Sequence, residues 1–373
     1  MKRIVHLGLG AFFRAHQAWY THAAPDAADW GIAAFTGRSA ALADALRAQG
    51  CRYTLVIRGP ETDETVEVTS ISDAYAGTDA ESWRRVWADP DTAIATMTVT
   101  EAAYADPALI GRLVDGLAAR RAAGAGPLAI VPCDNLPGNG DVVRRAIQAQ
   151  TAEDPGLDRW IAGHVSFVST MVDRITPASA PAEPVVTEPF HEWVLAGDFP
   201  AGRPAWEAAG ARFVADVRPH EQRKLWLLNG GHSLLAYEGS ARGHETVADA
   251  VSDPVCRAQL ERWWDEAARH LPLPPAEVAA YRAALLERWS NRRIRHRLEQ
   301  IAMDGWQKIP VRILPVLRLE RGAGRLPPGA VHALAAWVRH LRGGASSARA
   351  VLARLDPALA EDRDLVAAVA AAV

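Results

Sequence analysis

The stretch KRIVHLGLGAFFRAHQAWYTHAA, residues 2–24, predicts a short buried strand, a glycine turn and then a helix. Gly8 and Gly10 stand in the turn, while Phe13 occupies the position of the third glycine in the GxGxxG pattern. Two glycines between a strand and a helix suit a pyrophosphate group held over the start of the helix. An ordinary tight strand-to-helix turn would use the same residues, so this stretch alone favours neither interpretation.

Further apolar segments alternate with helical segments through the first half of the chain. A helix is predicted over residues 107–124, between two apolar segments that end in polar turns. Such alternation predicts a doubly wound parallel sheet, on which ligands bind beyond the carboxyl ends of the strands. The predicted strands cover residues 30–37, 92–104, 127–136 and 165–177, with residues 53–59 and 65–77 as a pair of added strands. The polar residues at the predicted strand ends are Thr100, Glu101, Cys133, Asp134, Asn135 and Asp173.

The character of the chain changes near residue 218. Beyond that point the pattern is almost continuously helical, from residues 221–239 to residues 332–344. We therefore expect an α/β protein with an N-terminal Rossmann-like doubly wound sheet over residues 1–217 and an all-helical C-terminal domain over residues 218–373. The N-terminal domain is expected to bind a cofactor and the C-terminal domain to bind the substrate.

The composition argues against several classes of protein. Of the 373 residues, 49% are hydrophobic, which argues against disorder. The net charge is −3 and no basic block occurs, which argues against a nucleic-acid partner. The three cysteines are widely spaced and form neither a disulfide framework nor a CxxC metal site. No signal peptide precedes the first strand and no apolar run reaches membrane-spanning length, so a soluble cytoplasmic protein with no membrane partner is expected.

Lysine is rare in this sequence. Only three of the 41 Lys and Arg residues are lysines, namely Lys2, Lys224 and Lys308. Arginine stays protonated in proteins, whereas a buried lysine can lose its proton and act as a base. We therefore treat Lys224 and Lys308, which lie in polar clusters, as candidate functional residues. Lys2, beside the start of the chain, is interpreted as a lysine present by chance. Asparagine is similarly rare and occurs only at Asn135, Asn139, Asn229 and Asn291.

The segment KLWLLNGGH, residues 224–232, places an amine, a carboxamide and an imidazole on one predicted helix. At 3.6 residues per turn, Asn229 and His232 lie about 140° and about 80° from Lys224 around the helix and spread over roughly 12 Å along its axis. This spread is too long for a single metal site and suits contacts along a substrate with many hydroxyl groups. Gly230 and Gly231 together weaken a helix by about 1–2 kcal/mol, so we expect them to allow close approach of a ligand or backbone. A buried helix with a satisfied histidine and asparagine is the alternative.

Taken together, these motifs resemble those of the long-chain mannitol dehydrogenase family. K-x4-N-x2-H at residues 224–232 is accompanied by GLGxFxRAHQAxY near the N-terminus, TxTExxY, CDNxxxNG, STMVDRITP and EPFxxWV. The resemblance extends from residue 3 to near residue 343. Residues 188–217 and 295–314 are most similar to the branch of D-mannonate oxidoreductases, also called fructuronate reductases.

The resemblance implies a role for each matching residue. Lys224 matches the general base of alcohol oxidation, and Asn135 and Asn229 match carboxamides that hydrogen-bond the reacting oxygen. His232 matches an imidazole that positions the substrate. Burial can lower the pKa of a lysine toward the working pH, and preorganised amides can stabilise charge on the oxygen. Of the other implied substrate-site residues, Glu221 matches an acid linked to proton exit, Asp173 a site acid, and Lys308 a residue that reaches the far end of the substrate.

The cofactor implied by the resemblance is NAD, with NADP left open. The second predicted strand ends in Thr36, Gly37 and Arg38, without the acid that binds a ribose 2′-hydroxyl, and Arg38 would suit a 2′-phosphate. The implied cofactor-binding residues are Gly8, Gly10, Ala11, Phe12, Arg38, Thr100 and Glu101.

The implied reaction interconverts a secondary alcohol and a ketone, with D-mannonate and D-fructuronate as the expected pair. A mannitol 2-dehydrogenase acting on mannitol and fructose is the alternative, and a non-catalytic dinucleotide-binding sensor is a more distant one. The expected partner is a small sugar acid or polyol. No metal is expected, because no cluster of His, Cys, Asp and Glu has zinc-ligand spacing. The sequence leaves both a monomer and a dimer open.

A basic run at residues 292–297 favours an acidic substrate. On a predicted helix, Arg293 and Arg297 share one face, and Arg293 is the expected substrate contact. A solvated helix face is the alternative interpretation of such a run.

Three departures from the family pattern affect the expected substrate range. Phe13 stands where the family usually has histidine, and Trp306 replaces a small residue, which predicts a narrower pocket. The chain also lacks part of the segment that follows Tyr104 in the family and some residues around 178–186.

Overall fold

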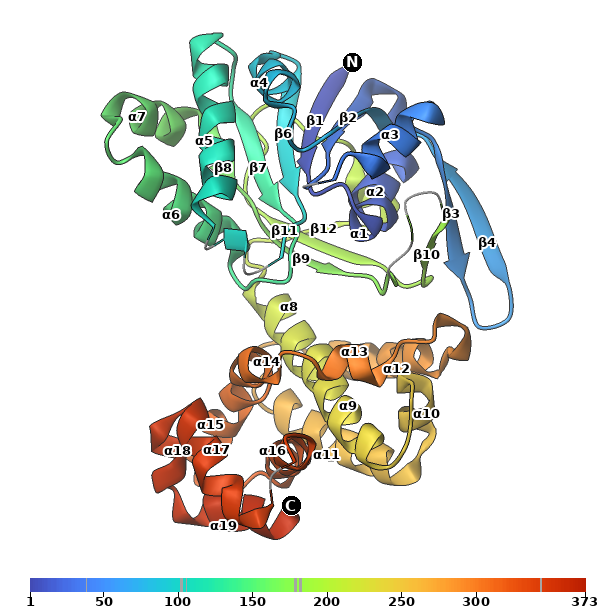
Figure 1. Ribbon diagram of the computed structural model, residues 1–373, viewed down its shortest axis with the longest axis vertical. Coiled ribbons are helices and arrows are strands. Elements are labelled where there is room, and N and C mark those ends of the chain that lie inside the picture. The colour runs from blue at the N-terminus through green and yellow to red at the C-terminus, as the bar shows by residue number, and fades with distance from the viewer. Residues whose placement is uncertain (38, 101–102, 105, 178–179, 181–182, 343) are drawn as a thin grey trace. The chain divides into compact units, whose positions relative to one another are not determined.

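The computed structural model describes residues 1–37, 39–100, 103–104, 106–177, 180, 183–342 and 344–373. The chain divides into two compact units, a sheet unit (Met1–Arg218) and a helical unit (Pro219–Val373), both drawn in Figure 1. The boundary predicted from the sequence, between residues 217 and 218, lies one residue earlier than this division.

The sheet unit is built on a six-stranded sheet in which every neighbouring pair of strands is parallel. The strand order is β5-β2-β1-β6-β7-β8, so the order reverses between β1 and β6. This is the order of a doubly wound dinucleotide-binding sheet, in which ligands bind at the reversal point. The predicted fold class is confirmed. The strands are β1 (Lys2–Leu7), β2 (Trp30–Phe35), β5 (Ile71–Tyr75), β6 (Thr92–Met97), β7 (Leu128–Pro132) and β8 (Val165–Phe167).

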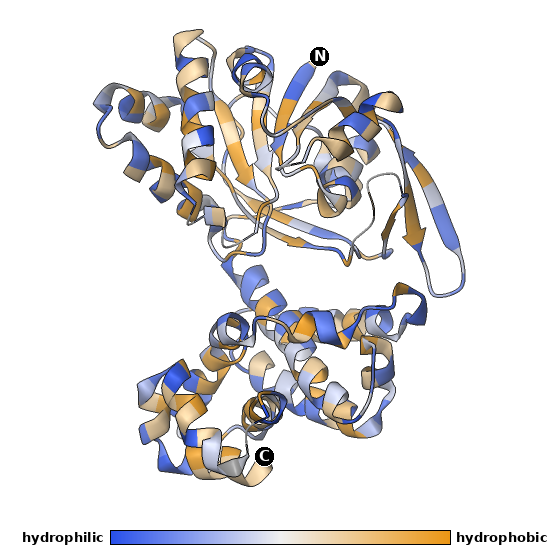
Figure 2. Ribbon diagram, viewed as in Figure 1, coloured by the Kyte–Doolittle hydropathy of each residue, from blue (hydrophilic) through white to orange (hydrophobic). Residues whose placement is uncertain are grey.

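Successive residues of the central strands enter different hydrophobic cores. Ile4 of β1 joins a core with α1, α2 and α3, whereas Val5 joins a second core with α4, α5, α6 and α7. Because side chains alternate along a strand, these two cores lie on opposite faces of the sheet. Strands covered on both faces carry continuous apolar runs, as the central strands do in Figure 2. The helices are α1 (Ala11–Ala15), α2 (Gln17–Ala23), α3 (Ala41–Ala48), α4 (Ala80–Ala88), α5 (Pro107–Ala122), α6 (Asn139–Thr151) and α7 (Pro155–His164), with short turns η1 (Ala27–Asp29) and η3 (Trp206–Ala209).

Two predicted strands are divided in the structure. Residues 65–77 form β4 and then β5, and only β5 joins the six-stranded sheet. Residues 165–177 form β8 and then β9, because beyond Val168 the backbone of Thr170 bonds the Asn139 side chain in both directions. Asp173 therefore ends an antiparallel strand of a small sheet, and its placement at the end of a parallel strand was wrong. The small sheets are β10-β3-β4 and β12-β11-β9, with β3 (Tyr53–Arg58), β4 (Asp63–Val68), β9 (Ser169–Asp173), β10 (Val185–Thr187), β11 (Glu192–Ala196) and β12 (Arg212–Phe213).

The helical unit surrounds one central helix, α9 (Gly231–Ala241). Residues 231–239 of α9 are all buried, as expected of a core helix that neighbouring helices cover on every side. Its neighbours include α10, α11, α13 and α16. The helical elements are α8 (Arg218–Arg223), η4 (Lys224–Gly230), α10 (Val247–Ser252), α11 (Pro254–Ala268), α12 (Pro275–Ser290), η5 (Arg292–Ile294), α13 (Leu298–Ala302), α14 (Gly305–Arg312), α15 (Leu314–Gly322), α16 (Pro328–His340), η6 (Ala345–Ser347), α17 (Ala348–Leu355), α18 (Pro357–Glu361) and α19 (Arg363–Ala372).

The basic run at residues 292–297 is not an α-helix. It begins in the 3₁₀ turn η5, passes through Arg295 at φ 48°, and continues extended at Arg297, which pairs with Thr246 in an isolated antiparallel bridge. Arg293 and Arg297 therefore do not share a helix face, and the prediction that they do was wrong. The backbone pairing with residues 245–247 outweighed the helical pattern of the sequence.

Among the described residues, none of the helices has both the length and the apolar composition needed to cross a membrane.

Candidate functional site

The turn after β1 lies where the strand order of the sheet reverses. Gly8 has φ 107°, and a Cβ atom there would stand 2.1 Å from the carbonyl oxygen of Thr98, just beyond β6. The Thr98 hydroxyl donates to the carbonyl of Gly8 at 2.8 Å and ties the two strand ends together. Only glycine fits at residue 8. Gly10 has an ordinary φ of −142°, and an added Cβ would meet only the carbonyl of Gly8 at 3.5 Å, so it leaves the turn open.

The start of α1 suits a phosphate group. Gly10 is the N-cap, and no side chain of the described residues caps this helix. The first N–H groups of a helix, here in the turn that contains Ala11 and Phe12, have no partner within the helix and attract anions. The open turn and the uncapped helix therefore fit the diphosphate of a dinucleotide.

Phe13 is a core residue. Its ring stacks on His6 with 3.6 Å between centroids, and both side chains are buried. Burial lowers the pKa of His6 to about 3, so the imidazole is neutral and bonds the hydroxyls of Thr96 and Thr98. The third position of the glycine pattern is thus filled by packing between α1 and the sheet.

Two of the predicted cofactor residues, Arg38 and Glu101, lie outside the described residues. Thr100 is exposed, and its carbonyl accepts a hydrogen bond from the N–H of Ala103 at 2.9 Å.

Polar residues follow β7, as predicted. Cys133 is buried, and burial followed by the charge of Asp134 raises the pKa of its thiol well above 9.0, so it is not a nucleophile. Asp134 accepts a hydrogen bond from Tyr104, and Asn135 is half-buried. Asn139, which sequence reasoning left without a role, bonds the backbone of β9 through its carboxamide. Asn139 therefore has a structural role, which is to hold the backbone of β9.

In the helical unit, residues 224–230 form a π-helical turn rather than an α-helical one. Two neighbouring tryptophans of α11 stabilise this turn. The indole N–H of Trp263 donates to the carbonyl of Trp226 at 2.8 Å, and that of Trp264 donates to the carbonyl of Leu227 at 2.9 Å. A π-helical turn is rare and is often found at functional sites.

The π-helical turn changes the relation between Lys224 and Asn229. Hydrogen bonds in this geometry run from residue i to residue i+5, so a residue five positions on returns close to the same face. The predicted separation of about 140° assumed 3.6 residues per turn and was wrong. Lys224 is buried, 8% exposed, and Asn229 is half-buried on the same stretch of helix.

The two glycines that end this turn make room for tryptophan rings. A Cβ at Gly230 would stand 2.8 Å from the ring of Trp263, and one at Gly231 would stand 2.8 Å from the ring of Trp289. The close neighbours are side chains, Trp263 at Gly230 and Trp289 with Leu260 at Gly231, so the expected approach of a backbone segment was wrong. The expected approach of a ligand stays a prediction.

His232 is the second residue of α9, and its side chain is 4% exposed. Burial lowers its pKa well below 6.5, and the nearby His296, Arg288, Arg312 and Lys224 lower it further. The ring is therefore neutral. Among the residues that the structure describes, neither Nε2 of His232 nor Oδ1 of Asn229 has a hydrogen-bond partner, although both atoms are buried.

The remaining predicted substrate residues differ in burial. Glu221 of α8 and Asp173 of β9 are buried, and Lys308 of α14 is half-buried and donates to the carbonyl of Ile301 at 3.1 Å. Arg293 is exposed, and its backbone N–H donates a hydrogen bond to the side-chain oxygen of Asn291.

Trp306, which was predicted to narrow the pocket, packs against two other side chains of the helical unit. Its ring packs edge-on against Trp337 with 4.6 Å between centroids, and the guanidinium of Arg354 lies 3.8 Å above it. These contacts with α16 and α17 account for a large side chain at this position.

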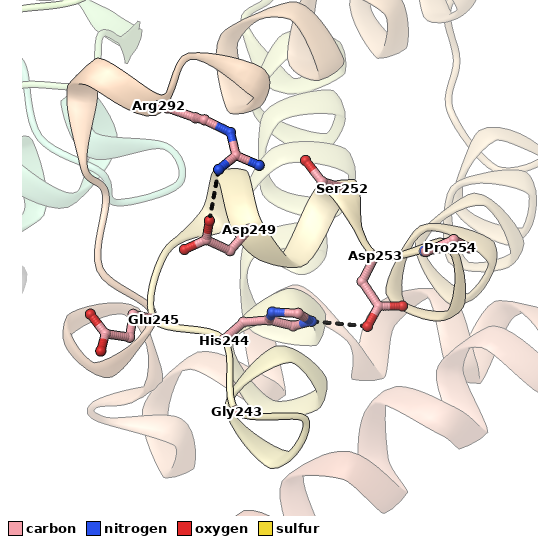
Figure 3. A pocket seen from close by; sticks show the side chains of 8 residues that line it. All are labelled: Gly243, His244, Glu245, Asp249, Ser252, Asp253, Pro254 and Arg292. Carbon is pink, nitrogen blue, oxygen red and sulfur yellow. Dashed lines mark hydrogen bonds and ion pairs between the residues drawn. The ribbon is translucent and has the colours of Figure 1, made fainter.

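A second polar cluster of the helical unit was not foreseen from the sequence. It borders a pocket of about 480 Å³ that is lined by both acids and bases, as Figure 3 shows. His244, Asp253 and Cys256 each bring one possible metal-ligand atom, and these atoms lie within 4.8 Å of one another. Asp253 is already engaged, because it caps α11 through the N–H of Val255 and accepts hydrogen bonds from Arg242 at 2.7 Å and His244 at 2.9 Å.

The comparisons with known proteins agree with this architecture. The family model of the mannitol dehydrogenase Rossmann domain matches residues 2–208, and that of the mannitol dehydrogenase C-terminal domain matches residues 216–372. The D-mannonate oxidoreductase of Escherichia coli (strain K12) is 38% identical over 96% of this chain and 84% of its own length. The mannitol 2-dehydrogenase of Cereibacter sphaeroides is 34% identical over 92% of this chain and 82% of its own length.

A solved structure is similar over the whole chain. The Pseudomonas fluorescens mannitol 2-dehydrogenase, solved as a ternary complex with NAD and D-mannitol, matches with a TM-score of 0.87 at 32% identity, covering 100% of this chain and 91% of the other. The family resemblance predicted from the motifs is confirmed. This chain belongs to the mannitol dehydrogenase family.

Proposed function

We propose that this oxidoreductase interconverts D-mannonate and D-fructuronate with a nicotinamide cofactor and without a metal ion. The observation that carries the proposal is the segment from η4 into α9. It holds Lys224, Asn229 and His232 within nine residues, and buried polar atoms of Asn229 and His232 have no partner among the residues that the structure describes. A relative that is 38% identical is a D-mannonate oxidoreductase, which supports the substrate pair.

The residues of the chain divide the chemistry between them. Lys224, whose side chain is buried, accepts the hydroxyl proton of the substrate as the general base. Asn229 and Asn135 hydrogen-bond the reacting oxygen and stabilise its developing charge. His232 orients the carbon chain, and Glu221, one turn before Lys224, returns the proton to water. A bound nicotinamide would supply the acceptor for the hydride that leaves the substrate carbon.

We propose NAD rather than NADP as the preferred cofactor. The similar Pseudomonas fluorescens enzyme was solved with NAD, and the turn at Gly8 with the uncapped start of α1 fits the diphosphate that both cofactors share. The ratio of kcat/KM for NADH and NADPH tests this preference. A clearly higher value with NADPH would overturn it and implicate Arg38.

The acid group of the substrate is proposed to be bound by Lys308. A charge-assisted hydrogen bond contributes about 1.5–3 kcal/mol, which corresponds to a preference on the order of tenfold or more for mannonate over mannitol. The expectation for Lys308→Ala is a larger loss of kcat/KM with mannonate than with mannitol. Equal losses with the two substrates would show that Lys308 does not bind the carboxylate.

A mannitol 2-dehydrogenase is the second candidate, because the similar solved structure carries D-mannitol. Rates with mannonate, altronate, mannitol, arabinitol and their keto partners, read at the absorbance of the reduced nicotinamide, decide between them. The highest kcat/KM with mannonate supports the proposal, and the highest value with mannitol replaces it with the second candidate. No turnover of any substrate would favour a non-catalytic sensor.

A further inference from the structure

Two aromatic side chains of the helical unit contact the ring of His232. The ring centroid of Trp289, from the end of α12, lies 4.7 Å from that of His232. The centroid of His296, from the segment between η5 and α13, lies 4.9 Å from that of His232, and the two imidazoles are nearly perpendicular at 84°. We call His232, Trp289 and His296 the ring cluster.

Each member of the ring cluster has a buried nitrogen without a partner. These atoms are Nε2 of His232, Nε1 of Trp289 and Nδ1 of His296, judged against the described part of the chain. Leaving one buried donor or acceptor unsatisfied costs about 1–3 kcal/mol. Three such atoms, on the ring of His232 and on the two rings that contact it, indicate a polar group that binds there.

A single unpartnered indole does not carry the same meaning. Nε1 of Trp87 in the sheet unit is also buried without a partner in the described structure. Trp87, however, packs within an apolar core, where Gly116 and Trp83 are among its neighbours. The ring cluster differs because its three nitrogens without partners in the described structure belong to His232 and to the two rings that contact it.

We propose that Trp289 and His296 are substrate-positioning residues, which together with His232 form a recess for a non-reacting hydroxyl group of the sugar chain. This inference rests on the proposed oxidation of a sugar acid or polyol, and it adds two residues that the sequence motifs did not single out. A hydroxyl group both donates and accepts hydrogen bonds. A neutral imidazole offers one donor and one acceptor, and an indole offers a donor.

The surroundings of the cluster keep its imidazoles in the neutral form that a hydroxyl needs. Burial, followed by the charge of Arg288, lowers the pKa of His296 to about 4. The same arginine also lowers the pKa of His232. A buried carboxylate would reverse this effect by favouring the charged imidazoles. The recess therefore suits a hydroxyl group, whereas the acid group is proposed to be bound by Lys308.

The backbone holds His296 in place before a ligand binds. Its carbonyl accepts a hydrogen bond from the N–H of Val247 at 2.9 Å, and the next residue, Arg297, pairs with Thr246. Within the basic run at residues 292–297, the arginines are exposed and only His296 and Ile294 turn inward. A polar contact fixed in this way is preorganised for binding.

The test removes the indole N–H and keeps an aromatic, though smaller, ring at residue 289. In Trp289→Phe we expect KM for mannonate and for mannitol to rise about 3- to 10-fold, because one neutral hydrogen bond is lost to either substrate. We expect kcat to change less than about twofold, because this hydroxyl does not react. The matched control, Trp87→Phe, removes an equally unpartnered N–H in the sheet unit and should leave both constants unchanged.

A second pair of variants asks which nitrogen of His296 is used. Asparagine places its amide near Nδ1 and glutamine places its amide near Nε2, so His296→Asn should keep KM close to the parent and His296→Gln should raise it. The unfolding midpoint of each variant serves as the control for structural damage.

The outcomes separate the recess from the proposed function. If the parent prefers mannitol, the proposed substrate is wrong, but the ratio of variant to parent KM with mannitol still tests the recess. An unchanged KM in Trp289→Phe, or equal values in His296→Asn and His296→Gln, would overturn the inference and leave a water-filled or purely structural cluster.

Discussion

Two polar clusters of the helical unit show opposite ways of burying a histidine. The ring cluster of His232, Trp289 and His296 is covered by protein but leaves three nitrogens without partners in the described structure. The cluster around Asp253, seen in Figure 3, pairs its histidine and its carboxylate within the protein. Both contain groups that sequence patterns associate with function.

The difference between the clusters shows how a ligand site can be recognised. A satisfied ionic cluster is stable without any further molecule, because each polar atom already has its hydrogen bonds. Several unpartnered buried atoms on contacting side chains lower stability, and a bound group that satisfies them would offset this cost. We therefore assign binding to the ring cluster and helix capping with loop anchoring to the Asp253 cluster.

The largest expected effect concerns Lys224, which lies eight residues before His232 of the ring cluster. Lys224→Met should lower kcat/KM by about 10²- to 10⁴-fold, because a general base contributes this much and methionine cannot accept a proton. The side chain is buried, so the apolar replacement should preserve folding. Steady-state kinetics with mannonate measure the loss.

The matched control is Lys2→Met in the sheet unit, where the amine bonds the carbonyl of Ala201. It should leave kcat/KM unchanged. If Lys224→Met kept more than a tenth of the parent activity, Lys224 would not be the base, and the assignment of chemistry to this segment would fail.

The second expected effect is on stability beside the ring cluster. Gly231→Ala would place its methyl group 2.8 Å from the ring of Trp289, which should cost about 1–3 kcal/mol of unfolding free energy as overpacking does. Gly163→Ala in α7 is the control, because its methyl group would meet nothing within 4 Å. That control should gain up to about 1 kcal/mol from helix propensity. Denaturant unfolding measures both changes, and a gain in both variants would show that Trp289 yields readily.

The third expected effect is a dependence of stability on pH. In the folded protein the pKa of His296 is lowered from 6.5 to about 4 by burial and then by Arg288. The unfolded chain therefore takes up a proton first as the pH falls, so this contribution to stability is complete above pH 6.5 and is lost toward pH 4. One proton changes the unfolding free energy by about 1.4 kcal/mol per pH unit.

Other buried histidines contribute to the same acid limb, so the comparison is with a variant. His296→Asn should lower the slope of unfolding free energy against pH, between pH 6.5 and 4, by the equivalent of one proton. Slopes measured by denaturant titration at several pH values decide the matter. Identical slopes in parent and variant would mean that His296 titrates alike in the folded and unfolded chain.

Much of the sheet unit could be predicted from local pattern. The alternation of apolar strands with helices predicts the doubly wound sheet, and Gly8 proves to be required by the carbonyl of Thr98. The division of residues 165–177 into two strands could not be predicted, because it depends on Asn139 bonding Thr170 across 31 positions. A period-two pattern does not say which sheet a strand joins.

The helical unit shows a sharper limit of sequence reasoning. Rarity identified Lys224 and Asn229, but the π-helical turn that brings them onto one face depends on Trp263 and Trp264, about 37 residues away. The basic run predicted Arg293 as a substrate contact, whereas in the structure Arg293 is exposed and His296 is half-buried. Tertiary packing decides which member of a polar run faces inward, and the local sequence does not predict it.

The last prediction concerns the Asp253 cluster, where we expect added or removed metal ions to have no effect. Its three possible ligands, His244, Asp253 and Cys256, are as close together as a zinc site would need. Binding nevertheless requires the carboxylate to give up Arg242 and His244, whose hydrogen bonds hold the pKa of Asp253 well below its usual range. It also requires a thiolate, yet burial raises the pKa of the Cys256 thiol to about 12. We therefore expect equimolar Zn²⁺ at pH 7 to leave the unfolding midpoint unchanged, and EDTA to leave kcat/KM unchanged. A rise of several degrees that EDTA reverses and that Cys256→Ala abolishes would instead make this cluster a metal site, and the distinction between paired and unpaired clusters would no longer separate structure from binding.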